Sequence, residues 1–274
     1  MVAWQHGRRV ATAVAAGLMI CGSGCAGHGH SEDARAADPV EELRRAVGAL
    51  VSAGSSKALT SMEMATGGTR VTIRGEGVYD YARRLGRLQV RLPQDPAGTS
   101  EHRPITELLA PGALFMKNRG AGVPADKWVR VDTATLSDGN LVTGGATDPF
   151  AAAEVLRGAR TATYVGEATV AGTSVRHYRG TADLAVAARS ASEGNRAPLR
   201  AAAKGFATAE VPFDAYVDHQ GRIRKIRHRF SFVNGQQKDT VAVASTTLLY
   251  GFGVPVTVTL PDSKDIYAGK LAEN

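Results

Sequence analysis

Two runs of alternating apolar and polar residues, joined by a short turn, constrain the fold of this chain more than any other feature. The first covers residues 211–218 and the second residues 223–232, with His219-Gln220-Gly221 between them. Alternation of period two is typical of strands with one dry face, and a glycine turn between two strands predicts an antiparallel hairpin. One hairpin cannot bury its apolar face alone, so it requires a larger sheet and a layer that covers it.

The N-terminal residues have the organisation of an export signal. Arg8 and Arg9 form a basic start, and Val10 to Ile20 is an apolar run too short for a comfortable membrane span. The small residues 22–24 and then Cys25 follow this run. We therefore predict a signal peptide over residues 1–24. It either ends before a cysteine that becomes modified, or is an ordinary signal peptide followed by an incidental cysteine.

The end of this segment resembles a bacterial lipobox, in which the cysteine after the cleavage point becomes diacylated. The resemblance implies lipidation of Cys25, although Gly22 stands where a leucine is usual. Cys21 has Leu18 in that place, but Ile20 is bulky for the usual cleavage. Residues 25–37 are small and polar, which predicts a flexible tether between the anchor and one folded domain over residues 38–274.

Cysteine content and charge limit the functions that are possible. Both cysteines, Cys21 and Cys25, lie in the signal peptide or directly after it, so the folded body would have no disulfide, thiolate nucleophile or cysteine-ligated metal. The formal net charge is +7, and removal of Arg8 and Arg9 lowers it by two. For an exported protein this mild basicity favours an anionic membrane surface over nucleic acid.

The remaining pattern predicts an α+β fold. We expect a strongly curved antiparallel sheet, a half-barrel of about ten strands, with helices covering its concave face. Helices are predicted after Asp38-Pro39 and Asp148-Pro149, as a short helix at Ile105–Leu109, and as two short helices between Leu184 and Phe206, where Gly194 and Pro198 interrupt the pattern. The predicted strands are 57–66, 69–81, 86–92, 113–117, 127–133, 161–170, 173–181, 211–218, 223–232, 241–252 and 255–260.

Catalytic motifs are missing from the sequence. It has no Gly-x-Ser-x-Gly elbow, His-Glu-x-x-His, P-loop or dinucleotide fingerprint, so we predict neither an enzyme nor a cofactor or metal site. His28 and His30 fit a polar tether better than a metal site. His228 shares a face with Ile226 and Phe230, as expected for a core histidine.

Charged residues of the central hairpin are expected on its outer face. Asp214 and Asp218 are interpreted as solvated, or paired with Arg222 and Arg224 across the hairpin. The apolar row changes parity along the second strand, and a bulge near Lys225 would keep the arginines outward. This face is either an ordinary solvated surface or a contact for anionic headgroups.

The order of elements resembles the LppX/LprG lipoprotein family of actinobacteria and, more distantly, the LolA/LolB carriers. The likeness rests on the export segment ending at Cys25, on Asp148-Pro149-Phe150 with the following hairpin 164–178, and on Val217 to Ile223 with Gly253 to Val258. It implies a half-open antiparallel barrel whose concave face encloses an apolar cavity for acyl chains of envelope lipids or lipoproteins. The expected location is the outer face of the cytoplasmic membrane.

A ligand cavity between the sheet and the helices is the main prediction for a site. Glycines and methionines in the apolar rows indicate either an adaptable interior or simply a large core. The predicted lining residues are Val71, Ile73, Gly75, Gly77, Val90, Met116, Phe150, Leu156, Phe213, Val217 and Phe230. The interrupted helices between Leu184 and Phe206 are the expected lid.

Two functions of different class follow from this reading. One is a monomeric, membrane-anchored carrier or chaperone for lipid or acylated ligands, with an envelope transporter or other envelope protein as a further partner. The other is an anchored interaction or sensor module without a transported ligand. Bound lipid favours the first, and a filled core with an exposed apolar patch elsewhere favours the second.

Overall fold

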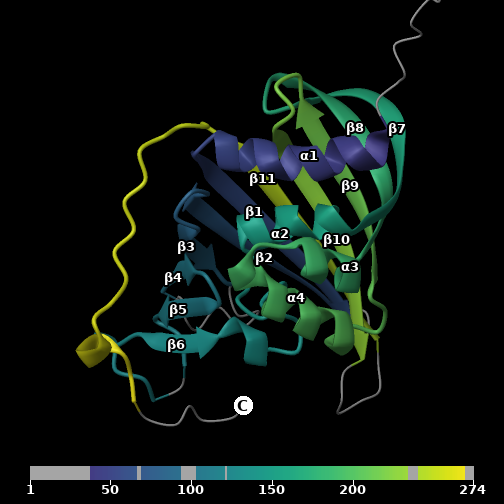
Figure 1. Ribbon diagram of the computed structural model, residues 1–274. Coiled ribbons are helices and arrows are strands. Elements are labelled where there is room, and N and C mark those ends of the chain that lie inside the picture. Colours follow the sequence, from purple (N-terminus) through teal and green to yellow (C-terminus); the bar gives the residue numbers. More distant parts are fainter. Residues whose placement is uncertain (1–37, 67–68, 94–102, 121, 234–239, 269–274) are drawn as a thin grey trace, which may run out of the picture. The chain divides into compact units, whose positions relative to one another are not determined.

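The computed structural model describes residues 38–66, 69–93, 103–120, 122–233 and 240–268. Within these ranges, eleven strands form one antiparallel sheet (Figure 1). The predicted export signal and tether, Cys25 included, lie outside the described residues. The strands are β1 Ser55–Thr66, β2 Thr69–Asp80, β3 Leu85–Arg91, β4 Ile105–Ala110, β5 Ala113–Lys117, β6 Val129–Asp132, β7 Ala159–Val170, β8 Thr173–Asp183, β9 Glu210–Asp218, β10 Ile223–Val233 and β11 Thr240–Tyr250.

The sheet consists of two meanders joined at its centre. Its strand order is β6-β5-β4-β3-β2-β1-β11-β10-β9-β8-β7, so only the β1–β11 pair brings distant parts of the chain together. Neighbouring strands elsewhere are consecutive in the chain, and helices stand between β8 and β9. The predicted α+β class and open curved sheet are confirmed.

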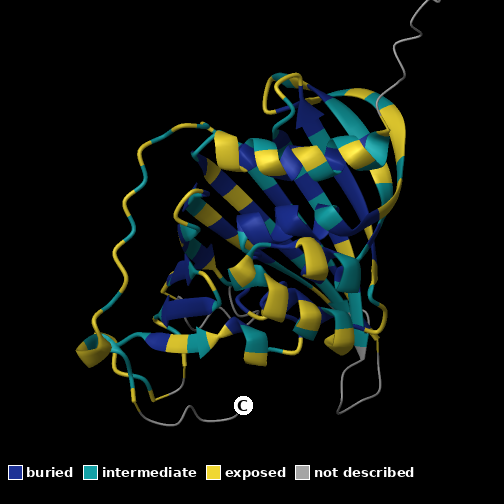
Figure 2. Cartoon of the chain, viewed as in Figure 1, coloured by how far each residue is buried: buried dark blue, intermediate teal, exposed yellow. Residues whose placement is uncertain are grey.

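Four α-helices cover one face of this sheet. They are α1 Pro39–Ser52, α2 Pro149–Val155, α3 Leu184–Ser190 and α4 Glu193–Gly205. Asp38 and Asp148 cap α1 and α2 as expected, each accepting a hydrogen bond from the helix backbone. Every residue of α2 is buried, whereas α1 and α4 alternate between buried and exposed residues (Figure 2).

The predicted short helix at Ile105–Leu109 is wrong, because these residues form β4. The strand pairs with β3 on one side and β5 on the other, and this pairing outweighs local preference. The pairing also turns Glu107 towards the covered face, opposite Leu88 and Met116. The correction therefore places a carboxyl group in the interior.

Two other predicted boundaries are corrected. Residues 255–260 are extended but pair with no neighbouring strand in the described part of the chain, where the only bridge of the C-terminal segment is Trp128 to Ile266. The break between α3 and α4 lies at residues 191–192, and Gly194 and Pro198 are inside α4. Gly194 suits its place because a side chain there would meet Pro111 at 2.7 Å.

The bulge predicted near Lys225 is present, since the β9–β10 register shifts between Ile223 and Lys225. Asp218 forms ion pairs with Arg222 at 2.9 Å and Arg224 at 3.8 Å, as expected. The outer face around the turn is therefore partly neutralised by the chain's own carboxylate.

Asp214 pairs with different residues from those expected. His177, Arg179 and Arg229 contact its carboxylate at 2.8, 3.0 and 2.7 Å. Burial alone would raise the pKa of Asp214, but hydrogen bonds from Arg229, His177 and Arg179 lower it to about 2. The three partners come from β8 and β10, the strands on either side of β9.

Two glycines of the sheet lie where neighbouring strands approach each other closely. A Cβ at Gly77 would overlap the carbonyl oxygen of Arg87 on β3, and one at Gly180 would overlap that of Thr161 on β7. Only glycine leaves room for the neighbouring backbone at such points. At Gly77, close strand contact accounts for the missing side chain that was interpreted as open space.

We predict that Gly77→Ala lowers the free energy of unfolding by about 1–3 kcal/mol, because its methyl group must push β2 and β3 apart. Gly48→Ala is the matched control. It lies in α1 with nothing within 4 Å of its Cβ position, so it should gain about 0.5–1 kcal/mol. Urea unfolding of both variants measures the difference, and an unchanged midpoint for Gly77→Ala would contradict this account.

Candidate ligand-binding site

The residues predicted to line a cavity all lie on the helix-covered side of the sheet. Eight of them belong to one buried apolar core, and Val71 is partly buried against it. Phe150 packs against Tyr79 and Tyr81, and Phe230 stacks on Phe206 with 4.8 Å between ring centroids. The buried residues are Ile73, Val90, Met116, Phe150, Leu156, Phe213, Val217 and Phe230.

Residues 136–148, the loop before α2, occupy the interior between these groups. Loops normally run over the surface because their backbone needs hydrogen bonds, yet most of this one is buried. A Cβ at Gly75 would lie 3.1 Å from the methyl group of Ala146, and one at Gly145 would lie 3.5 Å from both Ile73 and Val90. The 136–148 loop thus fills the space beside three predicted lining positions.

Asp138 supplies hydrogen-bond acceptors for the backbone of the buried loop. Its carboxylate accepts hydrogen bonds from the backbone N–H groups of Asn140, Val142 and Thr143 and from the Thr143 hydroxyl. Arg119 donates to the carbonyl oxygens of Thr143 and Gly144. Asp138 and Arg119 therefore supply hydrogen-bond partners for the backbone of the loop, which depends less on the strands of the sheet for them.

One hydroxyl pair fastens the loop to the centre of the sheet. The Thr147 hydroxyl donates to the Leu141 carbonyl oxygen at 2.9 Å, and its oxygen lies 2.5 Å from Ser245 Oγ on β11. Both residues are buried. This is the direct side-chain hydrogen bond between the described loop residues and β11.

The wall around the loop contains polar atoms without hydrogen-bond partners. Glu107 is fully buried and neither carboxyl oxygen has a partner among the described residues. A side chain at Gly144 would meet Asn140 Oδ1 at 2.8 Å and Glu107 Oε1 at 3.3 Å. Other unpartnered atoms on this side are Asn140 Oδ1, Thr60 Oγ1, Thr247 Oγ1 and His228 Nε2.

Burial controls the ionisation of two of these groups. It raises the pKa of Glu107 to about 8, with the Arg119 guanidinium opposing the shift, so Glu107 is mostly protonated at neutral pH. It lowers the pKa of His228 to about 3, which keeps the imidazole neutral. Both groups are therefore polar but mostly uncharged at neutral pH, and His228 is the core residue that the pattern predicted.

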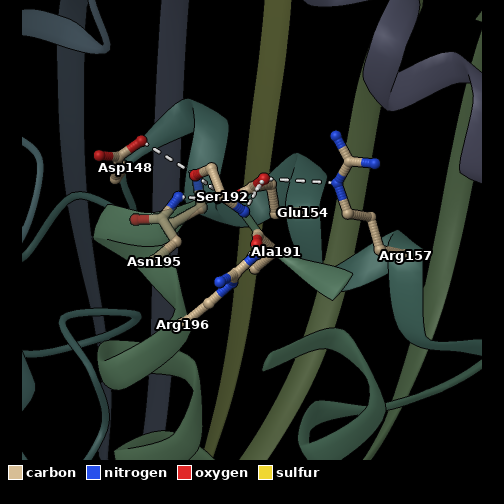
Figure 3. Close-up of polar contacts among 8 residues, drawn as sticks. Asp148, Glu154, Arg157, Ala191, Ser192, Asn195 and Arg196 are labelled. Atoms are coloured by element: carbon tan, nitrogen blue, oxygen red, sulfur yellow. Dashed lines mark hydrogen bonds and ion pairs between the residues drawn. The ribbon is translucent and has the colours of Figure 1, made fainter. Parts of the chain in front are cut away.

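The helices over the loop are tied together by Glu154 of α2. This fully buried carboxylate accepts hydrogen bonds from the Ser192 N–H at 2.8 Å, the Ser192 hydroxyl at 2.9 Å and the Asn195 amide at 2.6 Å (Figure 3). Arg157 adds a fourth donor at 3.3 Å. Bonds to charged groups contribute about 1.5–3 kcal/mol each, so α2 and α4 form a fastened cover.

Three features of this site were missed from the sequence. Residues 134–147 were expected only as a loop leading to the helix after Asp148-Pro149, Glu107 as part of a helix, and Glu154 received no role. Asp138-Gly139-Asn140 is a local signal for a turn capped by the aspartate, which could have pointed to an ordered loop. The described residues contain no group of three or more His, Cys, Asp or Glu side chains arranged for a metal, and no helix there is long and apolar enough to cross a membrane.

No protein-family model matches the chain, and no curated protein matches it in sequence. Solved structures similar to it include lipoprotein LprF from Mycobacterium bovis (13% identity, TM-score 0.41, covering 81% of this chain and 96% of that chain). Lipoprotein LppX from Mycobacterium tuberculosis is 11% identical, with a TM-score of 0.43 and coverage of 80% and 97%. A LolA superfamily protein from Nitrosomonas europaea is 10% identical, with a TM-score of 0.35 and coverage of 85% and 99%.

These are the groups of proteins that the sequence resembles, so the predicted resemblance is confirmed. At these identities and TM-scores the likeness concerns the fold alone. It carries no information on ligand, partner or activity for this chain.

The buried carboxyl group gives a testable pH dependence. Above its ordinary pKa of 4.5, Glu107 loses its proton in the unfolded chain but keeps it in the folded chain up to about pH 8. Folding stability should therefore fall as pH rises through this window, by up to about 1.4 kcal/mol per pH unit. Burial raises the pKa of Asp148 to about 6, which acts in the same direction, and the lowered pKa of His228 acts in the opposite direction up to about pH 7, so the clean range for Glu107 is about pH 7 to 8.

We predict that Glu107→Gln removes this slope and makes the protein more stable than the wild type at pH 8. Urea unfolding at several pH values measures it. Glu210→Gln, at an exposed position of β9, is the matched control and should keep the wild-type slope. An equal slope in Glu107→Gln would show that Glu107 is not the responsible group.

Proposed function

We propose that this chain is an exported, lipid-anchored carrier that holds an acyl chain between the sheet and its helical cover. The observation that carries the proposal is the buried 136–148 loop, packed over polar side chains that it leaves unpartnered. An unsatisfied buried polar group costs about 1–3 kcal/mol. A segment that packs at such a cost is suited to leave its place when something else takes it.

Displacement of the loop would open a space with the chemistry of an amphiphile. Ile73, Val90 and Met116 would face an acyl chain, and the chain needs no charged group because each buried methylene contributes about 0.8 kcal/mol. Glu107 and Asn140 would face the polar end of the ligand. The ligand class proposed is therefore an envelope lipid or lipoprotein with acyl chains and a hydrogen-bonding head.

We place the gate at the 136–148 loop and not at the helices between Leu184 and Phe206, which were the lid expected from the sequence. Glu154 fastens α4 to α2 and so holds these helices in place. The 136–148 loop is held to the sheet at β11 by the single Thr147–Ser245 contact. Because hydroxyl pairs contribute only about 0.5–1.5 kcal/mol net, this contact yields more easily than the Glu154 network.

A second candidate is an anchored interaction module. Its specific support is the interior filled by the 136–148 loop, together with the exposed apolar surface on the side and edge of the sheet that the helices leave free, where Leu59, Tyr164 and Val165 are 40–52% exposed. It predicts no bound lipid. Native mass spectrometry of the protein purified from its own membranes separates the two, because a carrier should retain an acylated molecule.

A disulfide between loop and sheet tests the gate. The Thr147 and Ser245 oxygens lie 2.5 Å apart, so cysteines at these positions would place their sulfurs within bonding range. We predict that the oxidised Thr147→Cys/Ser245→Cys protein takes up no fluorescent hexadecanoyl lipid from vesicles and that reduction restores uptake. Each single variant is a control and should not respond to oxidant. Equal uptake by the oxidised and reduced double variant would contradict the gate.

The anchor has its own test. We predict that Cys25→Ala releases the protein into the medium, because one diacylglyceryl group supplies the two chains that stable anchoring requires. Cys21→Ala should remain membrane-bound. Fractionation and immunoblotting measure both, and the reverse result would assign the anchor to Cys21.

A further inference from the structure

The uncovered, outer face of the sheet has a hollow of about 500 Å³ over β11, β1, β2 and β3. This volume is within the usual range for small-molecule sites, about 300–1,000 Å³. The hollow lies on the opposite side of the sheet from the 136–148 loop, because eight of its ten lining residues have the opposite parity to the buried rows; Thr60 and Gly75, the other two, belong to those rows. It is lined by Leu59, Thr60, Ser61, Arg74, Gly75, Glu76, Gln89, Arg91, Thr246 and Leu248.

An apolar pair forms one part of this hollow. Leu59 and Leu248 are direct cross-strand partners between β1 and β11. Leu59 is 40% exposed, which makes it one of the few large apolar residues left open to solvent among the described residues. An exposed apolar pair at the base of a hollow is suited to an aliphatic chain.

Two arginines stand opposite each other at the same hollow. Arg74 on β2 and Arg91 on β3 are direct cross-strand partners, and both are exposed. Like charges in this arrangement are unfavourable. An anion between them would convert the repulsion into two charge-assisted contacts.

Three other arginines of the outer face have acidic partners within the chain. Arg179 and Arg229 share Asp214, and Arg227 lies 3.8 Å from Glu63. At the hollow, Glu76 is the single acid among the described lining residues, against two arginines. The hollow therefore keeps a net positive charge beside an apolar pair, which is the complement of an anionic amphiphile.

We propose that this outer hollow binds a single anionic amphiphile, with its aliphatic chain along Leu59 and Leu248 and its phosphate or carboxylate between Arg74 and Arg91. Ser61, Gln89 and Thr246 supply further hydrogen-bonding groups around the head. This second site is independent of the interior cavity, since the sheet separates the two.

Calorimetric titration with dodecyl phosphate below its micelle concentration tests the site. The titration uses the Cys25→Ala chain that carries the oxidised Thr147–Ser245 cysteine pair, so that the interior loop is held closed. We expect saturable binding, at least tenfold weaker binding in Arg74→Gln/Arg91→Gln, and weaker binding in Leu59→Ser. Arg189→Gln/Arg200→Gln, with the same net charge on exposed helix positions, should bind like the parent.

Several outcomes would overturn the proposal. These are absence of binding, unchanged affinity in Arg74→Gln/Arg91→Gln, equal affinity for neutral dodecyl maltoside, or equal affinity for inorganic phosphate, which would mean that the aliphatic chain contributes nothing. The Arg74→Gln/Arg91→Gln protein should still take up hexadecanoyl lipid when the interior loop is free. Loss of that uptake would show one shared site, whereas its retention keeps the two proposals separate.

Discussion

The curvature of the sheet is the constraint on which the other features depend. Strands approach closely at Gly77 and Gly180, where only glycine leaves room for the neighbouring backbone. The curved sheet presents a wide apolar face to four helices, of which α2 and α3 have only seven residues each. The 136–148 loop occupies part of the space that remains, and its glycines allow its backbone to approach Ile73, Val90 and Glu107.

The loop and the helices cover the interior by different means. Glu154 is a buried charge with four donors, and removing a partner from such a group would leave an uncompensated carboxylate. The loop satisfies its backbone through Asp138 and touches walls whose carboxyl, amide and hydroxyl groups stay unpaired. Strong bonds thus hold the helices to each other, whereas the loop is held to the sheet mainly by packing.

The parts of the fold predicted from the sequence are those determined by local periodicity. Alternation defined the central hairpin and its bulge, and Asp-Pro pairs defined the starts of α1 and α2. The helix expected at Ile105–Leu109 failed because strand pairing with β3 and β5, which is not local, decided it. Residues 255–260 failed for the converse reason, since their alternation is correct but no strand of the described residues pairs with them.

The sequence predicted on which face of the sheet the candidate site lies, but not the loop and the buried carboxyl group that form it. Parity alone placed Ile73, Val90 and Phe213 on the covered side. It could not show that a loop would bury itself there, or that Glu107 would lie beneath it, because both depend on how distant segments meet. Gly77 shows the same limit, since a missing side chain has the same sequence signature whether it leaves a void or admits a neighbouring backbone.

A buried loop also answers a difficulty that any acyl-chain carrier faces. Fifteen methylenes at about 0.8 kcal/mol each would contribute roughly 12 kcal/mol, which corresponds to nanomolar binding and slow release. If the loop occupies the same space, the ligand binds only the fraction of molecules whose loop is displaced, and its apparent affinity falls by that fraction. A loop displaced in one molecule in a hundred would weaken binding about a hundredfold, and its return would drive the ligand out. On this argument the unpaired polar groups around the loop set the balance, because each one lowers the stability of the closed state.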